Sequence, residues 1–395
     1  MSDRQAALSL QPDHILYRSQ RASLGAGMLG LAVAGAGGLV NADQFFRSYL
    51  VAYLFFIGIA LGSLGLVSLN HVTGGRWGVV IRRVCESAMR TLPLLLILFL
   101  PILLGLSHLY EWARPEAVAQ DPGLQHKQLY LNVPFFVVRV GIYFTVWLVV
   151  SHYLVRWSRE QDATGDPDVV RRLQFLGRGA LLLYSLTMTF AAIDWAMSLE
   201  PHWSSTIYGI LIIGGQVLSA FAFVIPVLAL LSDRAPLSEL VSAEQFHDLG
   251  KLMLAFVMLY AYFAFSQFLI IWSANLPEET PWYLARSRGG WQYLAVILVL
   301  FQFALPFVIL LSRSLKRNAR RLAAVALVVL AARLLDLFWL LKPAFSPARF
   351  SVHWMDVAAV LGVGGLWLSF FLLRLRDQPL LPLRDPALPL EAEVA

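Results

Sequence analysis

The chain has 395 residues, of which 58% are hydrophobic and only 14% are charged, whereas about a quarter of the residues of a soluble globular domain are charged. This composition excludes an ordinary soluble protein, and the formal net charge of +6 is then no indication of nucleic-acid binding. The one cysteine, Cys85, excludes an intrachain disulfide, cysteine-ligated iron–sulfur clusters and covalent haem attachment. We therefore expect no metal site and no covalently bound cofactor.

Long apolar segments dominate the chain. A helix needs roughly 20 mostly apolar residues to cross about 30 Å of hydrocarbon. We count about ten such segments, at residues 22–41, 48–70, 84–109, 133–155, 174–194, 204–231, 249–273, 291–312, 322–341 and 355–373. The predicted fold class is therefore all-α, a polytopic membrane protein. The first 21 residues carry several charges and are not expected to be a signal peptide, and residues 374–395 form a Pro-rich tail after the transmembrane domain at 22–373.

Basic residues are distributed unevenly between the predicted loops. If the N-terminus is cytoplasmic, 21 of the 31 Lys and Arg residues fall on the cytoplasmic side, 7 fall outside and the remainder lie within spans. Cytoplasmic loops of membrane proteins carry an excess of Lys and Arg. We therefore predict that both termini lie in the cytoplasm, and we expect the bacterial inner membrane as the location.

The first span is rich in Gly and Ala, with the sequence GAGMLGLAVAGAGG. Small residues allow helix backbones to approach closely in a membrane. Because this span has little bulk, we expect a peripheral helix or one that contacts a partner.

Three spans are predicted to end on the outer face in clusters of aromatic and acidic residues. These clusters are SHLYEW after the third span, DWAMSLEPHW after the fifth and WSANLPEETPWY after the seventh. Trp and Tyr are common at membrane interfaces, but acidic residues beside them at three places are less expected. We predict an organised outer surface that docks a partner or handles protons.

Charged residues inside the predicted spans are candidates for function, because a charge at the membrane centre costs about 2.5–3.5 kcal/mol on insertion scales. Glu86 can pair with Arg90 four residues later, and Arg139 lies about two turns into the fourth span. Arg333 and Asp336 are three residues apart in the ninth span, near its middle, and can pair on one helix face. These charged residues either form structural pairs or belong to a proton relay. In a relay, a carboxylate beside an arginine has a tunable pKa.

The segment DWAMSLEPHW places Asp194 at the end of the fifth span and Glu200 and His202 in the turn that follows. An ordinary helix start explains part of this pattern, because Pro201 suits a first helical turn. Asp194 and His202 are too far apart to pair on one helix, so any contact would form across the turn. We expect these side chains to open onto water above the bundle. A quinone site would instead need an apolar slot with an Asp or His that takes a hydroxyl proton; the candidates are Asp194, His202 and Trp195.

At the start of the seventh span, His247, Asp248 and Lys251 can share one helix face. Ordinary helix-entry chemistry, with an acid in the first turn and a lysine that reaches the interface, gives the same pattern. The other interpretation is the inner mouth of a proton path.

Several segments together resemble the membrane subunits of alternative complex III, a bacterial quinol:cytochrome c oxidoreductase, within the NrfD/polysulfide-reductase membrane-subunit family. They are DPGLQHKQLYLNVPFFVVR, DWAMSLEPHWSSTIYG, FHDLGKLM and FSQFLIIWSANLPEETPWYL. The likeness covers residues 86–356, and the chain is most similar to the smaller of the two large membrane subunits. Asp194, Glu200 and His202 match one motif, His247, Asp248 and Lys251 another, and Arg139 a third. Glu86, Arg333 and Asp336 are added on physical grounds.

The resemblance implies two four-helix bundles, at about 48–194 and 204–341, flanked by one helix at each end. It implies oxidation of menaquinol or ubiquinol near the outer face, with haem and iron–sulfur clusters held in partner subunits. The expected partners are the larger paralogous membrane subunit, the iron–sulfur subunit, c-type cytochrome subunits and lipid, with a terminal oxidase as a further candidate. In this family the quinol site is linked to the larger membrane subunit, and the smaller one is linked to proton passage.

Two other functions fit the composition. A structural membrane anchor for redox subunits would use the buried charges for assembly only. A secondary transporter would need helices broken at corresponding places in two halves, and we see no such pair in the sequence. Haem b is not expected, because nearly all the histidines lie at span ends or in loops.

Overall fold

The computed structural model describes residues 10, 13–233 and 237–386. Ten helices in this part of the chain are long and apolar enough to cross a membrane, and no strand occurs among the described residues. The chain is therefore an all-α, multi-pass membrane protein, as the sequence predicts. The spans are formed by α2 (Ile15–Val40), α3 (Ala42–Thr73), α4 (Arg76–Met89) with α5 (Leu92–Leu104), α9 (Val133–Thr164), α10 (Pro167–Trp195), α11 (Tyr208–Leu231), α13 (Ala243–Ala274), α15 (Trp291–Leu298) with the π-helix η3 (Val299–Ala304) and α16 (Leu305–Leu311), α18 (Ala319–Leu341) and α19 (Trp354–Arg376).

Capping residues determine where several of these helices begin and end. The connection from α9 to α10 is an example: Gly165 adopts a left-handed conformation (φ 67°) at the C-cap of α9. The next residue, Asp166, caps α10 by accepting a hydrogen bond from the backbone N–H of Asp168, and Pro167 follows it at the first helical position. Gly after a helix and Pro at the start of the next one are the residues preferred at these positions.

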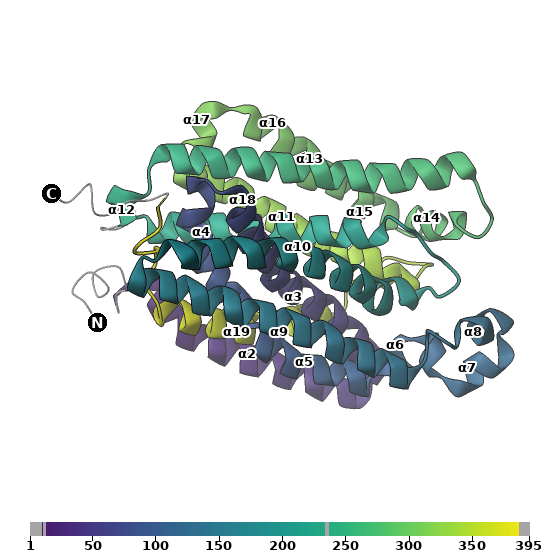
Figure 1. The fold of residues 1–395 in the computed structure, drawn as a ribbon. Coiled ribbons are helices and arrows are strands. Elements are labelled where there is room, and N and C mark those ends of the chain that lie inside the picture. Colours follow the sequence, from purple (N-terminus) through teal and green to yellow (C-terminus); the bar gives the residue numbers. More distant parts are fainter. Residues whose placement is uncertain (1–9, 11–12, 234–236, 387–395) are drawn as a thin grey trace.

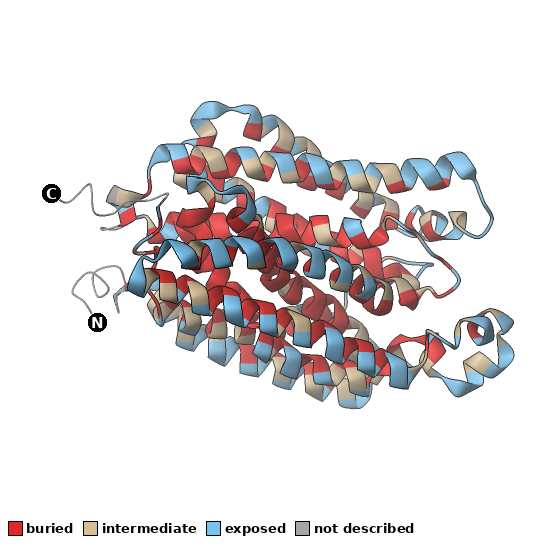
Figure 2. Cartoon of the chain, viewed as in Figure 1, coloured by how far each residue is buried: buried red, intermediate tan, exposed pale blue. Residues whose placement is uncertain are grey.

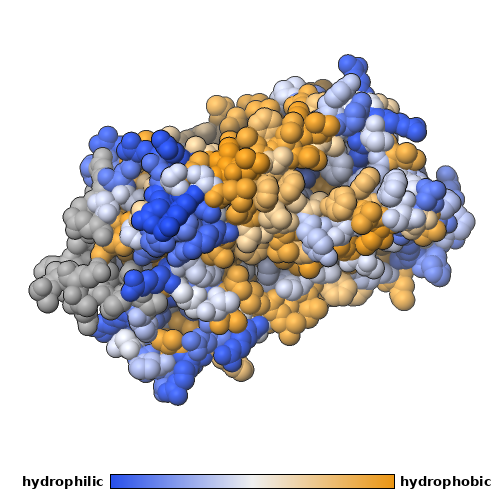
Figure 3. Space-filling model, turned by 90° about the horizontal axis from the view of Figure 1, so that it is seen from above, coloured by the Kyte–Doolittle hydropathy of each residue, from blue (hydrophilic) through white to orange (hydrophobic). Residues whose placement is uncertain are grey.

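The helices pack as two four-helix bundles with two flanking helices. Bundle one contains α3, α4–α5, α9 and α10, and bundle two contains α11, α13, α15–η3–α16 and α18. The helices α3 and α11 are the most buried, at 94% and 83% of their apolar windows, because the two bundles meet along them. Figure 2 shows this buried centre, with the exposed faces on the outer helices. The apolar band across the middle of the molecule in Figure 3, with polar residues towards both ends, is the surface expected to face lipid.

The Gly-rich first span is peripheral, as its composition predicts. Only 17% of the apolar window of α2 is buried, and its main neighbour is α19. A Cβ atom on Gly30 would lie 2.5 Å from the backbone N of Gly362, and one on Gly27 would lie 2.4 Å from the backbone N of Leu366. The small residues of α2 therefore serve close packing against α19.

The start of α2 and the described part of the tail after α19 lie at one end of the molecule, which we call the termini end. The short helices α7 (Pro115–Gln120), α8 (Pro122–Lys127) and α14 (Thr280–Arg286) lie at the opposite, loop end (Figure 1). The described part of the Pro-rich tail folds back onto bundle one at the termini end. The Asp385 carboxylate is 2.7 Å from the Arg82 guanidinium, and both side chains are buried. Gln378 donates to the Arg83 carbonyl, and the Leu383 N–H donates to Asp162.

We expect Asp385→Asn to lower the free energy of unfolding by about 1–3 kcal/mol, because the buried Arg82 loses its charged partner. The matched control is Asp377→Asn, since Asp377 is 45% exposed and its nearest cations are 3.8 and 3.9 Å away. Exposed pairs contribute about 0–1 kcal/mol. Thermal unfolding in detergent, followed by size-exclusion chromatography, measures both. Equal effects of the two substitutions would mean that the tail contributes nothing to stability through Asp385.

Candidate functional site

The centre of the candidate site is a buried pair on α18, Arg333 and Asp336. The Arg333 guanidinium donates to Asp336 Oδ2. The hydroxyl of Tyr260, on α13, donates to the same oxygen at 2.5 Å, and the guanidinium lies over the Tyr260 ring. All three residues are buried. Arg333 is the fifteenth of the 23 residues of α18 and Tyr260 is the eighteenth of the 32 residues of α13, so the group lies near the middle of these spans, as the sequence predicts.

A chain of polar side chains leads from this group towards the boundary between the bundles. Arg333 Nε is 3.4 Å from Ser219 Oγ on α11. Gln216, one turn away, accepts a hydrogen bond of 2.8 Å from the hydroxyl of Tyr184. Gln216, Ser219 and Arg333 line an enclosed cavity of about 20 Å³, together with Trp195. The rest of the lining is apolar, but the volume is large enough for one water molecule, and these three polar side chains could hold it.

On its other side, the Arg333 group faces a much larger cavity of about 1070 Å³ between α13, α14, α15, η3 and α18. Asp336, Tyr260 and Gln302 belong to its lining. Gln302 lies in the π-helix, and its amide, oriented to suit its neighbours, accepts from Arg333 Nη1 at 3.1 Å and donates to the Ala332 carbonyl at 3.3 Å. Single π-helical turns are frequent at functional sites; this one directs an amide towards the Arg333 group.

At the loop end of the large cavity, an ion pair connects the DWAMSLEPHW segment to α14. Arg286 Nη2 is 2.7 Å from Glu200 Oε2 and also donates to the Leu340 carbonyl. The guanidinium stacks on the Trp282 ring, and Trp282 stacks on Trp203 with 4.7 Å between the ring centroids. Glu200 therefore holds α14 against the bundle.

Gln267 and Tyr283 supply further polar groups near this end of the cavity. Gln267 donates to the Tyr283 hydroxyl at 3.4 Å and accepts from Ser205 at 3.3 Å. Burial raises the pKa of Tyr283 to about 12. The phenol is therefore neutral at physiological pH, and its O–H remains available as a donor.

Bundle one contains a similar group, but it is sealed. Arg139 makes two hydrogen bonds to Asp194, of 2.8 and 2.9 Å, and Tyr143 donates to Asp194 at 2.7 Å. The Asp194 side chain is 0% exposed. The expectation that Asp194 opens onto water above the bundle is therefore wrong, because Arg139 and Tyr143 enclose it.

The three quinone-adjacent candidates do not meet at one place. His202 is 60% exposed and pairs with Asp121 at 2.8 Å, so it does not contact Asp194 across the turn. Trp195 is buried among aromatic rings of bundle one, including Phe99 at 4.9 Å and Trp147 at 5.7 Å. Asp194 and Trp195 share Tyr143 as a neighbour, whereas His202 lies apart from both.

At the termini end of bundle one, Glu86 is fully buried and pairs with Arg83 at 2.5 Å. The prediction that it pairs with Arg90 is wrong. Arg90 lies where α4 ends, and it points to the start of the tail, donating to the Arg374 carbonyl. Arg83 also pairs with Asp162 of α9. No hydrogen bond among the described residues joins this termini-end network to the Tyr184–Gln216 pair.

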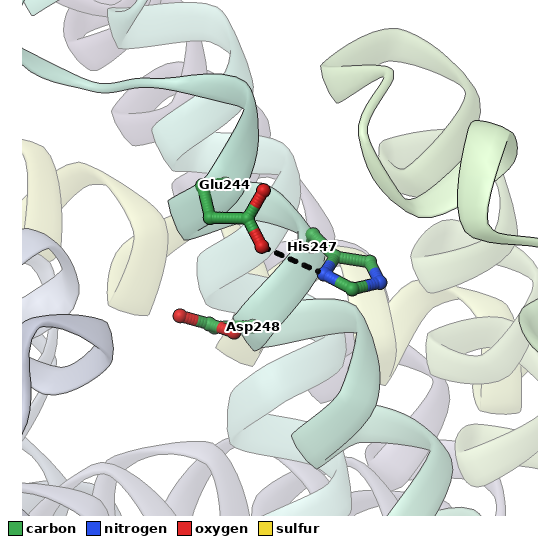
Figure 4. A group of neighbouring side chains, drawn as sticks. All are labelled: Glu244, His247 and Asp248. Atoms are coloured by element: carbon green, nitrogen blue, oxygen red, sulfur yellow. Dashed lines mark hydrogen bonds and ion pairs between the residues drawn. The ribbon is translucent and has the colours of Figure 1, made fainter.

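The acids and histidine at the start of α13 form a cluster whose atoms are close enough to hold a metal ion: Glu244, His247 and Asp248. Figure 4 shows these three side chains and the 3.2 Å contact of His247 Nδ1 with Glu244. Each acid already has a cationic partner, since Arg317 is 2.6 Å from Glu244 and Lys251 is 2.8 Å from Asp248. The cluster is a set of helix-entry ion pairs, and we assign no metal to it.

The partners that define these groups were not predicted from the sequence. Neutral polar side chains in an apolar helix do not stand out as charged ones do, and the partners here include Tyr143, Tyr260, Gln216 and Gln302. A buried amide in a membrane span nevertheless needs hydrogen-bond partners. Arg286 was counted only as a loop charge. Arg286 lies four residues after Trp282 on a short helix, and this spacing could have indicated that the two side chains stack.

Comparison with known protein families and with curated proteins finds no match for this chain.

Proposed function

We propose that this chain belongs to a quinol:cytochrome c oxidoreductase of the alternative complex III type, as the smaller of its two large membrane subunits. We also propose that it provides a proton path in bundle two. The observation that carries the proton path is the position of Asp336. It is a buried carboxylate between a cation, a phenol and a cavity. A carboxylate in such surroundings can take up and release a proton when its neighbours or its hydration change.

The polar groups of bundle two support a path through the loop-end half of the membrane. They follow one another from the Tyr184–Gln216 pair through Arg333 and Asp336 to the cavity that reaches α14. The excess of Lys and Arg at the termini end supports a cytoplasmic position for that end. The loop end is then the outer face, where quinol oxidation would release protons.

The alternative, a membrane anchor for redox subunits, is favoured by one observation. The Asp194 carboxylate of bundle one is 0% exposed, whereas Asp336 lines the large cavity, so a structural role suits the Arg139–Asp194 pair. We therefore assign assembly to bundle one and proton passage to bundle two. A secondary transporter would need helices broken at corresponding places. The breaks at Arg90–Thr91 and at η3 lie in the second helix of bundle one and in the third helix of bundle two, so they do not correspond between the bundles, although each lies in the third span of a set of five.

The test is Asp336→Asn in the assembled complex, reconstituted in proteoliposomes, with quinol:cytochrome c turnover and proton release measured together. We expect turnover within about twofold of wild type and a clear fall in the protons released per electron, because the amide keeps the hydrogen bonds but cannot titrate.

Asp194→Asn is the matched control, since it removes the same charge from the enclosed group of bundle one. In complexes that assemble, it should leave the proton stoichiometry unchanged. If Asp336→Asn released as many protons per electron as the wild type, the proposed proton path would be contradicted. A chain that never co-purifies with cytochrome or iron–sulfur subunits would contradict the proposed complex.

A further inference from the structure

Lys316 is a buried cation without a counterion. It is the last residue of the short helix α17 (Arg313–Lys316) and is only 7% exposed. Its stem packs on α13, where a Cβ atom added to Gly250 would lie 2.7 Å from Lys316 Cγ. Within the described part of the chain, its ammonium group has no ion pair and no hydrogen bond. A buried charge is costly unless it is paired, so a counterion from outside the chain would stabilise this lysine.

Lys251 of α13 is a second cation near Lys316. Burial and, after it, the charge of Lys251 lower the pKa of Lys316. Lys251 is 51% exposed and pairs with Asp248 at 2.8 Å. Glu244, on the same helix, pairs with Arg317 at 2.6 Å. The two acids at the start of α13 therefore neutralise other cations, and neither is bonded to Lys316.

The connection from α16 to α18, residues 313–321, has a surplus of positive charge. Its sequence, RSLKRNARR, contains five Lys and Arg residues and no acid. Two of the five pair with acids elsewhere on the chain, at 2.6 and 3.6 Å. The other three have no acidic partner among the described residues: Arg313, Lys316 and Arg321. Two of the five, Arg320 and Arg321, also lie in the first turn of α18, where the helix dipole favours an anion.

This cationic connection lies where lipid head groups meet the protein. It begins directly after α16, whose residues Val308 and Leu311 are 63% and 58% exposed. α17 lies at the termini end in Figure 1, and Figure 3 shows hydrophilic residues at that end beside the apolar band. The excess of Lys and Arg supports a cytoplasmic position for this end, and the cytoplasmic leaflet carries anionic lipids.

We propose that Lys316, together with Lys251 and the unpaired arginines of residues 313–321, binds the phosphate of an anionic phospholipid. Ammonium and guanidinium groups are donors only, and both bind phosphate oxygens. A zwitterionic lipid brings a cation with its phosphate and would neutralise none of the surplus charge. The acyl chains would lie along the exposed apolar surface of α16, which a free phosphate would not use. This inference is independent of the proposed function, because these residues lie outside the polar groups of the proton path.

The test is native mass spectrometry of the full-length chain in detergent, with phosphatidylglycerol or phosphatidylcholine of the same acyl chains. We expect phosphatidylglycerol to bind about tenfold more tightly. Lys316→Met keeps an apolar stem over Gly250 but removes the charge, and it should reduce this preference about fivefold, the effect of one cation near a membrane surface. The matched control is Arg156→Met, because Arg156 is an exposed cation of α9 without an acidic partner in the described structure. It should leave the preference unchanged.

Thermal unfolding in detergent gives a second measurement on the same proteins. Phosphatidylglycerol should raise the unfolding midpoint of the wild type more than that of Lys316→Met. Without added lipid, Lys316→Met should unfold no earlier than the wild type, because the substitution removes a buried charge that lacks a partner.

Three results would overturn the proposal. Equal losses of lipid preference in Lys316→Met and Arg156→Met would mean that general surface charge attracts the lipid. Displacement of phosphatidylglycerol by millimolar inorganic phosphate would mean that the site takes a free phosphate. A Lys316→Met protein that unfolds well below the wild type in the absence of lipid would mean that Lys316 stabilises the fold without an external anion.

Discussion

Arg139→Leu is expected to destabilise the protein by about 3–5 kcal/mol, because it leaves a buried carboxylate without its cation. Arg139 makes two hydrogen bonds to Asp194 and a third to the Tyr130 carbonyl. Its guanidinium also lies between the rings of Tyr130 and Phe135, 3.9 and 4.4 Å from their centroids. Without it, only the Tyr143 hydroxyl would remain to stabilise a carboxylate that is 0% exposed.

The fraction of protein that elutes as a monodisperse peak after heating in detergent measures this loss. Arg172→Leu is the control, because Arg172 pairs with Glu160 at 2.7 Å but is 44% exposed, and exposed pairs contribute about 0–1 kcal/mol. The double substitution of Arg139 and Asp194 by Leu should recover much of the stability, since a buried pair replaced by apolar side chains is often neutral. If Arg139→Leu were as stable as Arg172→Leu, the buried Arg139–Asp194 pair would contribute no more to stability than an exposed pair.

The fold was predictable because it depends mainly on where the long apolar runs lie along the sequence. A run of about 20 apolar residues must be a membrane helix, since lipid cannot satisfy backbone polar groups. The helices extend past these runs, for example to Thr164 in α9, because polar residues beyond the membrane continue the helix until a capping residue ends it. The break between Met89 and Leu92 was not predicted; the apolar pattern of that span continues past it.

The site was predictable only in part, because the sequence locates charges but not their partners. The Arg333–Asp336 pair is local to one helix turn and was found by spacing. Arg139 and Asp194 were both selected, but their pairing joins residues 55 positions apart. Glu86 was predicted as a site residue because it is a charge inside a span. Its predicted partner, Arg90, was wrong, because Arg83 lies on the same helix, pairs with Glu86 and also reaches Asp162. Cavities depend on how helices pack, so nothing in the sequence indicated the one beside Asp336.

Gly62→Ala is expected to separate the two bundles locally and to destabilise the protein by about 1–3 kcal/mol, the usual cost of overpacking. Gly62 lies on α3 where it crosses α11. A Cβ atom there would be 2.1 Å from the backbone oxygen of Gln216 and 2.6 Å from its carbonyl carbon. Backbone atoms in the middle of a buried helix cannot move aside as a flexible side chain can, so α11 itself must shift.

The shift should also affect proton release, because Gln216 and Ser219 of α11 line the small cavity next to Arg333. We expect a lower unfolding midpoint in detergent and fewer protons released per electron in proteoliposomes. Gly141→Ala is the control, since Gly141 lies in the α9 span with nothing within 4 Å of an added Cβ. Ala is about 1 kcal/mol more favourable than Gly in a helix interior, so Gly141→Ala should be neutral or stabilising. A Gly62→Ala protein as stable as this control would mean that α3 and α11 do not cross as closely as described, and that the polar chain at their contact tolerates movement.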